Sequence, residues 1–428
     1  MSTEATTEDF SSPTLDELAE SGGLQAPDLH PSTQALLRRM SRYGGLTDRV
    51  SVGSARRRMS SMMPMVAARP SVASVVDRRI PGPGGPVPIR IVTPHGGRAP
   101  RAALVWFAGG GFVLGDLSTA EPTARSLAAR TGAVVICVDY RKAPEHDIHD
   151  AYDDALAAVR WVVATADGLG VDPTRIGVGG DSAGGNVAAV VAQEYSAEAD
   201  VPLAVQVLVY PSLSGEHEPA RARNAHGGAL DLTAMRWFEG HVAGAIDPHS
   251  TRYSPMTTAD LSALPPAVIV TAGHDPLRDE GIVYLDRLRQ AGVRSEHLHY
   301  PDEVHGFFAM DLILDNAVHA MDATAERLLD LLRLDGEGAR NAGRQAALQA
   351  LLLRQLRVRS GQLSYLVDQA VRLQAAYQRR LMRLMRLPND RDVEALEAGM
   401  KRLEAQVRAL RRQLERATTD RPPEPPRA

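Results

Sequence analysis

Short apolar runs alternate with longer amphipathic segments between about residue 72 and residue 334. Runs of this length are typical of strands that are buried on both faces of a parallel sheet, and residues 87–93 alternate as a half-buried strand does. The pattern predicts strands at 87–93, 102–107, 133–138, 175–179, 204–209 and 267–271, and helices at 119–130, 151–165, 185–198 and 280–291. This alternation indicates an α/β fold with a mostly parallel, doubly wound sheet.

The N-terminal part of the chain divides into two segments. Residues 1–31 are rich in Ser, Thr, Pro and acids, which predicts a disordered tail. Residues 32–68 are rich in Met and Arg and predict one or two helices, with a break at Gly44-Gly45. Methionines adapt to irregular contacts, so this segment suits a helical cap over an apolar pocket. An ordinary packed helix explains the same pattern equally well.

The C-terminal part follows a different pattern. Arginine, leucine, alanine and glutamine dominate from residue 338, and Pro388 interrupts the helical pattern. The apolar residues beyond it repeat at alternating spacings of three and four, which is a heptad seam: Val393, Leu396, Met400, Leu403, Val407, Leu410 and Leu414. We therefore predict a basic helical and coiled-coil module at 339–417, which self-associates into a homo-oligomer, and a Pro-rich tail at 418–428.

Composition and charge narrow the class of protein. The 428 residues include 44% hydrophobic and 23% charged residues, a balance typical of a soluble globular protein. No apolar run reaches the length of a membrane span, and the acidic N-terminus does not resemble a secretory signal. We therefore expect a cytoplasmic protein. Residues 335–428 contain 19 basic and 11 acidic side chains, so the net charge of −4 conceals a basic C-terminal part.

A pentapeptide of the G-x-S-x-G type surrounds Ser182. It follows the predicted strand at 175–179 and precedes the predicted helix at 185–198. A strand, a sharp turn and a helix in this order expose a serine hydroxyl at a helix N-terminus. The sequence therefore predicts Ser182 as a nucleophile, although a Gly-rich turn without chemistry has the same composition.

A nucleophilic serine needs a general base, and the base needs an orienting acid. Asp275 follows the predicted strand at 267–271, and His305 lies in a predicted loop before the last helix of the α/β region. We predict His305 as the base and Asp275 as the acid. Spacing alone leaves alternatives open, which are Asp279, Asp302, Glu303 and His274.

Three glycines, Gly109 to Gly111, follow the predicted strand at 102–107. Because glycine has no side chain, the backbone N–H groups of such a run can approach a ligand oxygen closely, as an oxyanion hole requires. A flexible turn is the alternative. The position of the glycines ahead of Ser182 favours the oxyanion hole.

These motifs together resemble the hormone-sensitive-lipase family of α/β-hydrolases, in its bacterial esterase branch. The resemblance spans about residues 68–334 and rests on GGGFVLGD at 109–116, DYRKAPEH at 139–146, GDSAGGN at 180–186, LPP at 264–266, DPLRDEG at 275–281 and HGF at 305–307. It implies an α/β-hydrolase domain at 69–334, with an insert at 215–247 that shapes an acyl pocket together with the N-terminal cap.

The resemblance also implies a reaction. It assigns Ser182 as nucleophile, Asp275 as acid, His305 as base, and the N–H groups of Gly110, Gly111 and Ala183 as oxyanion donors. The substrate implied is a small-molecule acyl ester, and the reaction needs no cofactor and no metal.

One residue departs from the family pattern. Ala108 stands where the family usually has a histidine before the three glycines. The oxyanion donors are backbone groups and survive this change, but a side chain that braces the loop is lost. Lowered or altered activity is therefore an expectation.

The C-terminal module resembles the coiled coil of phasin-like proteins that coat polyhydroxyalkanoate granules. A basic amphipathic helix is compatible with a lipid or granule surface. Plain oligomerisation explains the heptads equally well, and nucleic acid is not expected because aromatic residues are isolated there. The first hypothesis is an active serine carboxylic-ester hydrolase with an oligomerising or granule-targeting module. The alternative is a granule-associated structural protein with a weak or vestigial hydrolase domain.

Overall fold

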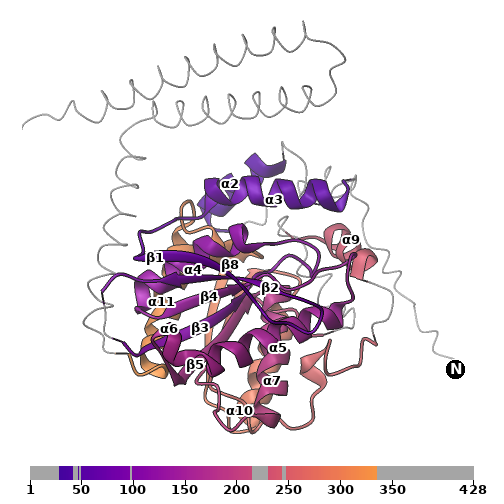
Figure 1. Ribbon diagram of the computed structural model, residues 1–428. Coiled ribbons are helices and arrows are strands. Elements are labelled where there is room, and N and C mark those ends of the chain that lie inside the picture. Colours follow the sequence, from indigo (N-terminus) through magenta and orange to yellow (C-terminus); the bar gives the residue numbers. More distant parts are fainter. Residues whose placement is uncertain are drawn as a thin grey trace, which may run out of the picture. The chain divides into compact units, whose positions relative to one another are not determined.

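A computed structural model describes residues 28–41, 47, 50–96, 99–214, 230–242 and 247–334 of the chain. Within these residues, eight strands form one sheet in the order β1-β2-β4-β3-β5-β6-β7-β8. β1 and β2 pair antiparallel, as do β2 and β4, and every other neighbouring pair is parallel. The predicted α/β class with a mostly parallel sheet is therefore confirmed (Figure 1).

The buried strands lie where the apolar runs predict them. Their bounds are β2 Val87–Thr93, β3 Arg101–Phe107, β4 Val134–Val138, β5 Val171–Asp181, β6 Gln206–Val209 and β7 Ala267–His274. Cys137 lies in β4 and is fully buried, and burial raises the pKa of its thiol to about 12. This thiol is therefore an apolar core residue and not a reactive group.

Two strands at the sheet edges were not predicted. β1 spans Ser74–Ile80 and β8 spans Ser295–Val304. Both are rich in charged and polar residues, and most of β1 is exposed. Edge strands contact the core on fewer sides than central strands do, so their apolar pattern is weak. β8 runs up to Val304, so His305 lies in a turn directly after a strand and before α11, as the predicted loop position requires.

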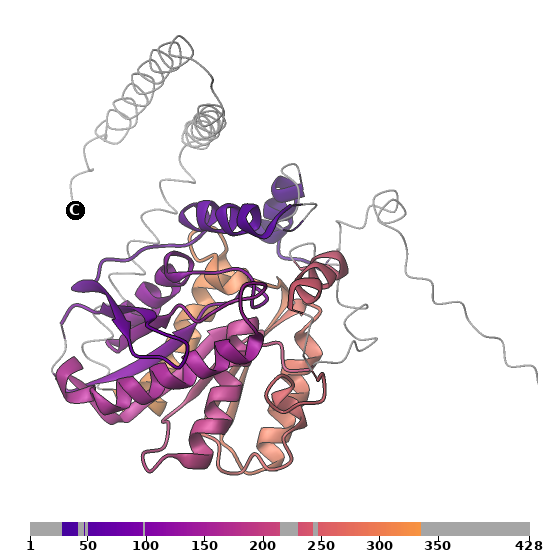
Figure 2. The ribbon, with the colours of Figure 1, turned by 45° about the vertical axis from the view of Figure 1, so that its right-hand side comes forward.

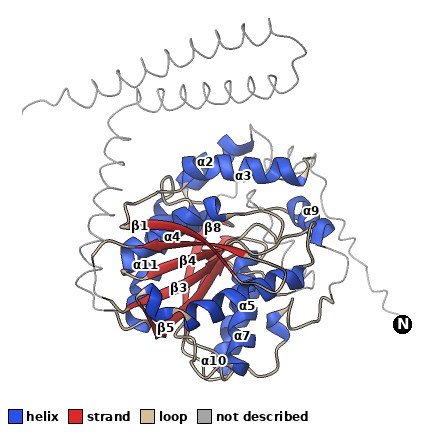
Figure 3. Cartoon of the chain, in the orientation of Figure 1, coloured by secondary structure: helices blue, strands red, loops and turns tan. Residues whose placement is uncertain are grey.

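Two helical layers enclose the sheet, as Figure 3 shows. One apolar core joins a face of the sheet to α5, α7 and α10, and the other core joins the opposite face to α4 and α11. The bounds of these helices are α4 Leu117–Thr131, α5 Ile148–Ala164, α7 Ala183–Glu198, α10 Arg278–Gln290 and α11 Asp315–Leu331. Short helices α6 Ala166–Leu169, η2 Pro255–Thr257 and η3 Phe307–Ala309 complete the connections.

Three further helices lie at one end of the sheet and cover the pocket described below. α2 spans Pro31–Ser41, α3 spans Val52–Val66 and α9 spans Leu232–Val242. Figures 1 and 2 show α2 and α3 above the sheet, with α9 beside them. The described residues of the cap segment therefore contain two helices, and α9 falls within the predicted insert. Leu29 is buried, so packed structure begins a few residues before the predicted end of the N-terminal tail.

Several predictions fall on residues outside the described ranges. These are the disordered tail up to residue 27, most of the insert around α9, the coiled-coil module at 339–417 and the Pro-rich tail. They stay predictions. Among the helices that the structure describes, none is long and apolar enough to cross a bilayer.

Candidate active site

Ser182 occupies a sharp turn between a strand and a helix. β5 ends at Asp181 and α7 begins at Ala183, and Ser182 has φ +57° and ψ −121°. A side chain at Gly184 would lie 2.0 Å from the Phe107 carbonyl oxygen, and one at Gly180 would lie 2.2 Å from the Gly184 oxygen. The turn is therefore tight enough to need both glycines, and it places Ser182 at the start of α7.

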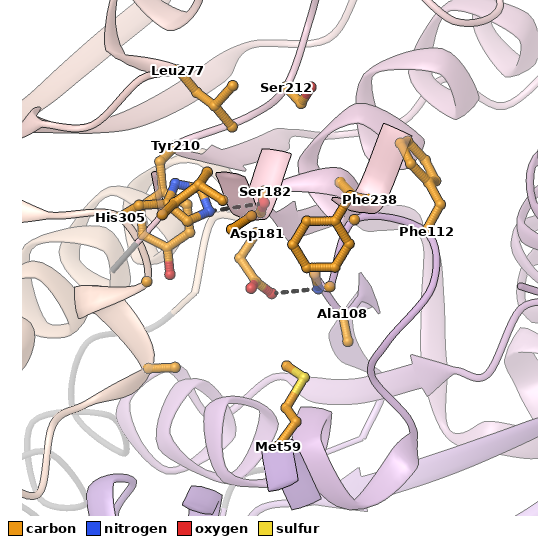
Figure 4. A pocket seen from close by; sticks show the side chains of 18 of the residues that line it. Met59, Ala108, Phe112, Asp181, Ser182, Tyr210, Ser212, Phe238, Leu277 and His305 are labelled. Atoms are coloured by element: carbon orange, nitrogen blue, oxygen red, sulfur yellow. Dashed lines mark hydrogen bonds between the residues drawn. The ribbon is translucent and has the colours of Figure 1, made fainter. Parts of the chain in front are cut away.

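The structure brings three predicted residues into one hydrogen-bonded row. Ser182 Oγ lies 2.9 Å from His305 Nε2, and His305 Nδ1 lies 2.8 Å from Asp275 Oδ2. Asp275 is fully buried, and its other oxygen accepts the backbone N–H of Leu277 at 2.8 Å. This arrangement holds the imidazole in one orientation, with Nε2 directed at the serine hydroxyl (Figure 4).

The alternative acids have other partners. Asp279 pairs with Arg278 at 2.7 Å, and both Asp302 and Glu303 accept hydrogen bonds from Asn316. Glu303 also accepts the Thr33 hydroxyl from the cap. Among the described contacts, the carboxylate that reaches His305 is therefore that of Asp275.

The residues predicted to supply the oxyanion donors come from two segments, the glycine loop and the start of α7. Gly110 and Gly111 have φ +129° and +59°, conformations that favour glycine. Neither N–H group has a backbone acceptor among the described residues. Ala183 is the first residue of α7, where a helix leaves its N–H groups unpaired. All three residues line the same pocket as Ser182.

The glycine loop is braced although Ala108 replaces the usual histidine. Tyr140 Oη donates to the Ala108 carbonyl at 2.6 Å, and Gly109 N–H donates to Asp181 Oδ1 at 3.2 Å. On the cap side, Arg56 Nε donates to the Val113 carbonyl at 2.8 Å. The loop is therefore held from three directions without an imidazole.

A pocket of about 470 Å³ opens onto Ser182. Helices α2, α3 and α9 contribute much of its wall, and its polar lining near Ser182 includes Asp181 and His305. Phe238 of α9 packs on Gly111, because a side chain there would lie 2.2 Å from its ring. Methionines from α3 (Met59, Met62 and Met63) and α9 (Met235) line the pocket, and so does Met310 after η3. The cavity is mostly apolar, and its flexible side chains suit an acyl group.

The ionisable side chains that line the pocket are Asp181, Asp231, Glu239 and His305. Burial raises the pKa of Asp181 to about 6, although the Gly109 N–H and the nearby His305 oppose this shift. The Tyr210 ring lies 4.6 Å from the His305 ring, and burial raises the pKa of Tyr210 well above its usual range. Tyr210 is therefore neutral at ordinary pH and contributes a flat apolar contact to the imidazole.

Sequence reasoning missed three residues that support the site. Tyr140 and Asp181 lie inside the motifs that identify the family, but spacing gave no indication of their contacts with the glycine loop. Arg56 lies in a predicted cap helix and had no distinguishing signal. Within the part of the chain that the structure describes, no cluster of three or more His, Cys, Asp or Glu side chains could hold a metal ion.

A parallel sheet that presents a serine on a strained turn, with a histidine and an acid from later strands, defines an α/β-hydrolase. Residues 104–309 match the model of the family described as alpha/beta hydrolase fold. Esterase LipI of Mycobacterium tuberculosis is 42% identical over 251 residues, which cover 58% of this chain and 78% of that protein. The chain belongs to the alpha/beta hydrolase fold family.

Two further comparisons extend over more of the chain. Carboxylesterase NlhH of Mycobacterium tuberculosis is 38% identical over 301 residues, which cover 69% of this chain and 93% of that protein. The hyperthermophilic esterase of the archaeon Pyrobaculum calidifontis has a TM-score of 0.67 and 36% identity, with 71% of this chain and 98% of that chain covered. The predicted fold is therefore shared with solved esterase structures.

Proposed function

We propose that this chain is a serine carboxylic-ester hydrolase that acts through an acyl-enzyme. The observation that supports this most directly is the row Ser182–His305–Asp275, which opens onto an apolar pocket beside unpaired N–H groups. The relatives named as esterases and carboxylesterases agree with this assignment.

In the first half of the reaction, Ser182 Oγ attacks the ester carbonyl carbon while His305 Nε2 takes the serine proton. Asp275 keeps the proton on Nδ1, so Nε2 is free to act as the base. The carbonyl oxygen becomes an oxyanion and accepts the N–H groups of Gly110, Gly111 and Ala183. The C–O bond to the alcohol then breaks, and His305 returns the proton to the leaving oxygen.

In the second half, a water molecule repeats the attack on the acyl-enzyme. His305 takes a proton from the water, and the same N–H groups stabilise the second oxyanion. Collapse of this intermediate releases the carboxylic acid and returns the proton to Ser182.

The test is hydrolysis of p-nitrophenyl esters of graded chain length by the full chain and by Ser182→Ala. We expect the variant to lose at least about 10³-fold in kcat, because the nucleophile is absent. Ser61→Ala is the matched control, since Ser61 is exposed on α3 and, among the contacts of the described residues, donates to the Arg58 carbonyl. Equal activity of Ser182→Ala and the wild type would exclude the mechanism.

For the C-terminal module we propose self-association through the heptad seam. The support is the sequence pattern alone, because the segment lies outside the described residues. Replacing Leu403 and Leu410 by Asp in the full chain should lower the mass in sedimentation equilibrium while leaving hydrolysis intact. An unchanged mass would remove the proposal.

The alternative of a granule-associated protein with a vestigial hydrolase domain rests on the C-terminal resemblance and on Ala108. The bracing of the glycine loop by Tyr140 and Asp181 weighs against it, because the loop keeps support without the histidine. Absence of hydrolysis on every ester, together with binding of the full chain to lipid-coated polymer particles, would favour this alternative.

A further inference from the structure

Asp181 lies between the candidate nucleophile and the glycine loop. Its Oδ1 accepts the Gly109 N–H at 3.2 Å, and its backbone directly precedes Ser182. A side chain at Gly109 would lie 2.6 Å from Asp181 Oδ2 and 3.1 Å from Ser182 Cβ. The loop backbone therefore passes in direct contact with both residues (Figure 4).

The hydrogen bond between Asp181 and Gly109 lies within the run of three glycines, which is the part of the loop with the greatest conformational freedom. Gly109 precedes Gly110 and Gly111, which line the pocket, and three consecutive glycines have many accessible backbone conformations. Tyr140 binds the carbonyl before this stretch, and Arg56 binds the Val113 carbonyl after it. Among the described contacts, Asp181 is the side chain that binds an N–H group within the stretch.

We propose that Asp181 is a positioning residue that fixes the glycine loop so that the N–H groups of Gly110 and Gly111 meet the developing oxyanion. This inference rests on the proposed ester hydrolysis. Asp181 itself does not touch the reacting atoms. It acts through the Gly109 N–H, in a chain where Ala108 supplies no side chain to brace the loop.

The charge of Asp181 strengthens this contact. A carboxylate accepts an N–H more strongly than a neutral carboxyl group does. The groups that face Asp181 are His305, Tyr140 and Tyr210, and burial raises the pKa of both tyrosines far above neutrality. The Trp106 Nε1–H has no acceptor within hydrogen-bond distance among the described residues, but its dipole also favours the ionised carboxylate.

A pH dependence follows from this environment. Because burial raises the pKa of Asp181 to about 6, the carboxylate is ionised above that pH and becomes protonated below it. Protonation weakens the bond to Gly109 and loosens the loop.

The test compares Asp181→Ala, Asp181→Asn and the wild type in full-chain p-nitrophenyl ester hydrolysis. We expect Asp181→Ala to lower kcat by about 10- to 100-fold with little change in KM, because a small displacement of the donors affects the transition state most. Asn keeps an oxygen acceptor but carries no charge, so Asp181→Asn should retain more kcat at pH 8 than Asp181→Ala does, and less than the wild type. Asp172→Asn is the matched control, since it lies at the far end of β5 and binds Thr174 and Arg175.

The acid limb of log(kcat/KM) against pH gives a second readout that a purely structural role would not change. We expect the ratio of kcat/KM in the wild type to that in Asp181→Asn to fall toward one as the pH falls through about 6. Identical acid limbs, or an unchanged kcat in Asp181→Ala, would overturn the proposal. If Asp181→Ala does not fold, the pH profile of Asp181→Asn decides alone. Loss of activity in Ser182→Ala tests ester hydrolysis separately from this inference.

Discussion

Replacement of Asp275 by Asn tests the orientation of His305 with almost no change in shape. Both carboxylate oxygens of Asp275 accept N–H groups, one from His305 Nδ1 and one from Leu277, each at 2.8 Å. An asparagine has a single acceptor oxygen, so one of these two bonds must be lost. Because the side chain is fully buried, no bulk water can replace the missing partner.

The side-chain amide of the asparagine can adopt two orientations, which differ in free energy. If its oxygen keeps the Leu277 N–H, its amide faces His305 Nδ1 and moves the histidine proton to Nε2, where the base is needed. If its oxygen keeps His305, the Leu277 N–H is left unpaired at a cost of about 1–3 kcal/mol. The first orientation avoids that cost, so we expect kcat to fall by about 10⁴-fold, which corresponds to about 5.5 kcal/mol.

The assay is steady-state hydrolysis of a p-nitrophenyl ester, with thermal unfolding to verify the fold. Asp279→Asn is the matched control, because Asp279 is bound to Arg278 and does not reach His305. We expect that control to remain within about twofold of the wild type, as surface changes usually do. A kcat for Asp275→Asn within tenfold of the wild type, or a larger loss in Asp279→Asn, would refute the assignment.

Three further predictions follow from the same contacts. Ala108→His places an imidazole on the pocket wall and should shift the preferred p-nitrophenyl ester to a shorter acyl chain. Arg56→Met removes the bonds from α3 to Val113, Ala143 and Glu145 and should lower both Tm and kcat/KM, unlike Arg57→Met. For Asp181, the folded pKa of about 6 exceeds the ordinary value of 3.8, so its contribution to stability is lost as pH rises through 6. The stability of Asp181→Asn relative to the wild type should therefore rise between pH 5 and pH 7.5 by about 1.4 kcal/mol, which thermal unfolding at both pH values would detect as a larger Tm difference at the higher pH.

The central strands could be predicted from sequence because burial on both faces demands continuous apolar runs. β3 and β4 have this pattern, and the predicted runs match them within one residue. β1 and β8 could not be predicted in this way, because they lie at the sheet edges and their residues are largely polar. The fold class could therefore be predicted from the sequence of the central strands, whereas the sequence of the edge strands gave no comparable signal.

Some residues of the candidate site could likewise be predicted from the sequence, and others could not. Ser182, Asp275 and His305 could be selected because each lies in a local motif beside a predicted element. The support from Arg56 could not, because its partner Val113 is 57 residues away and the contact depends on how the cap packs. Spacing likewise left Asp279, Asp302 and Glu303 open until their partners were known.

The most direct test of the account is covalent capture of the nucleophile. The full chain is treated with diethyl p-nitrophenyl phosphate, digested, and analysed by mass spectrometry for the diethylphosphoryl adduct. We expect one adduct on the peptide that contains Ser182, in parallel with loss of ester hydrolysis, and none on that peptide in Ser182→Ala. Inactivation with the adduct on a different residue, or full activity with Ser182 modified, would contradict the account.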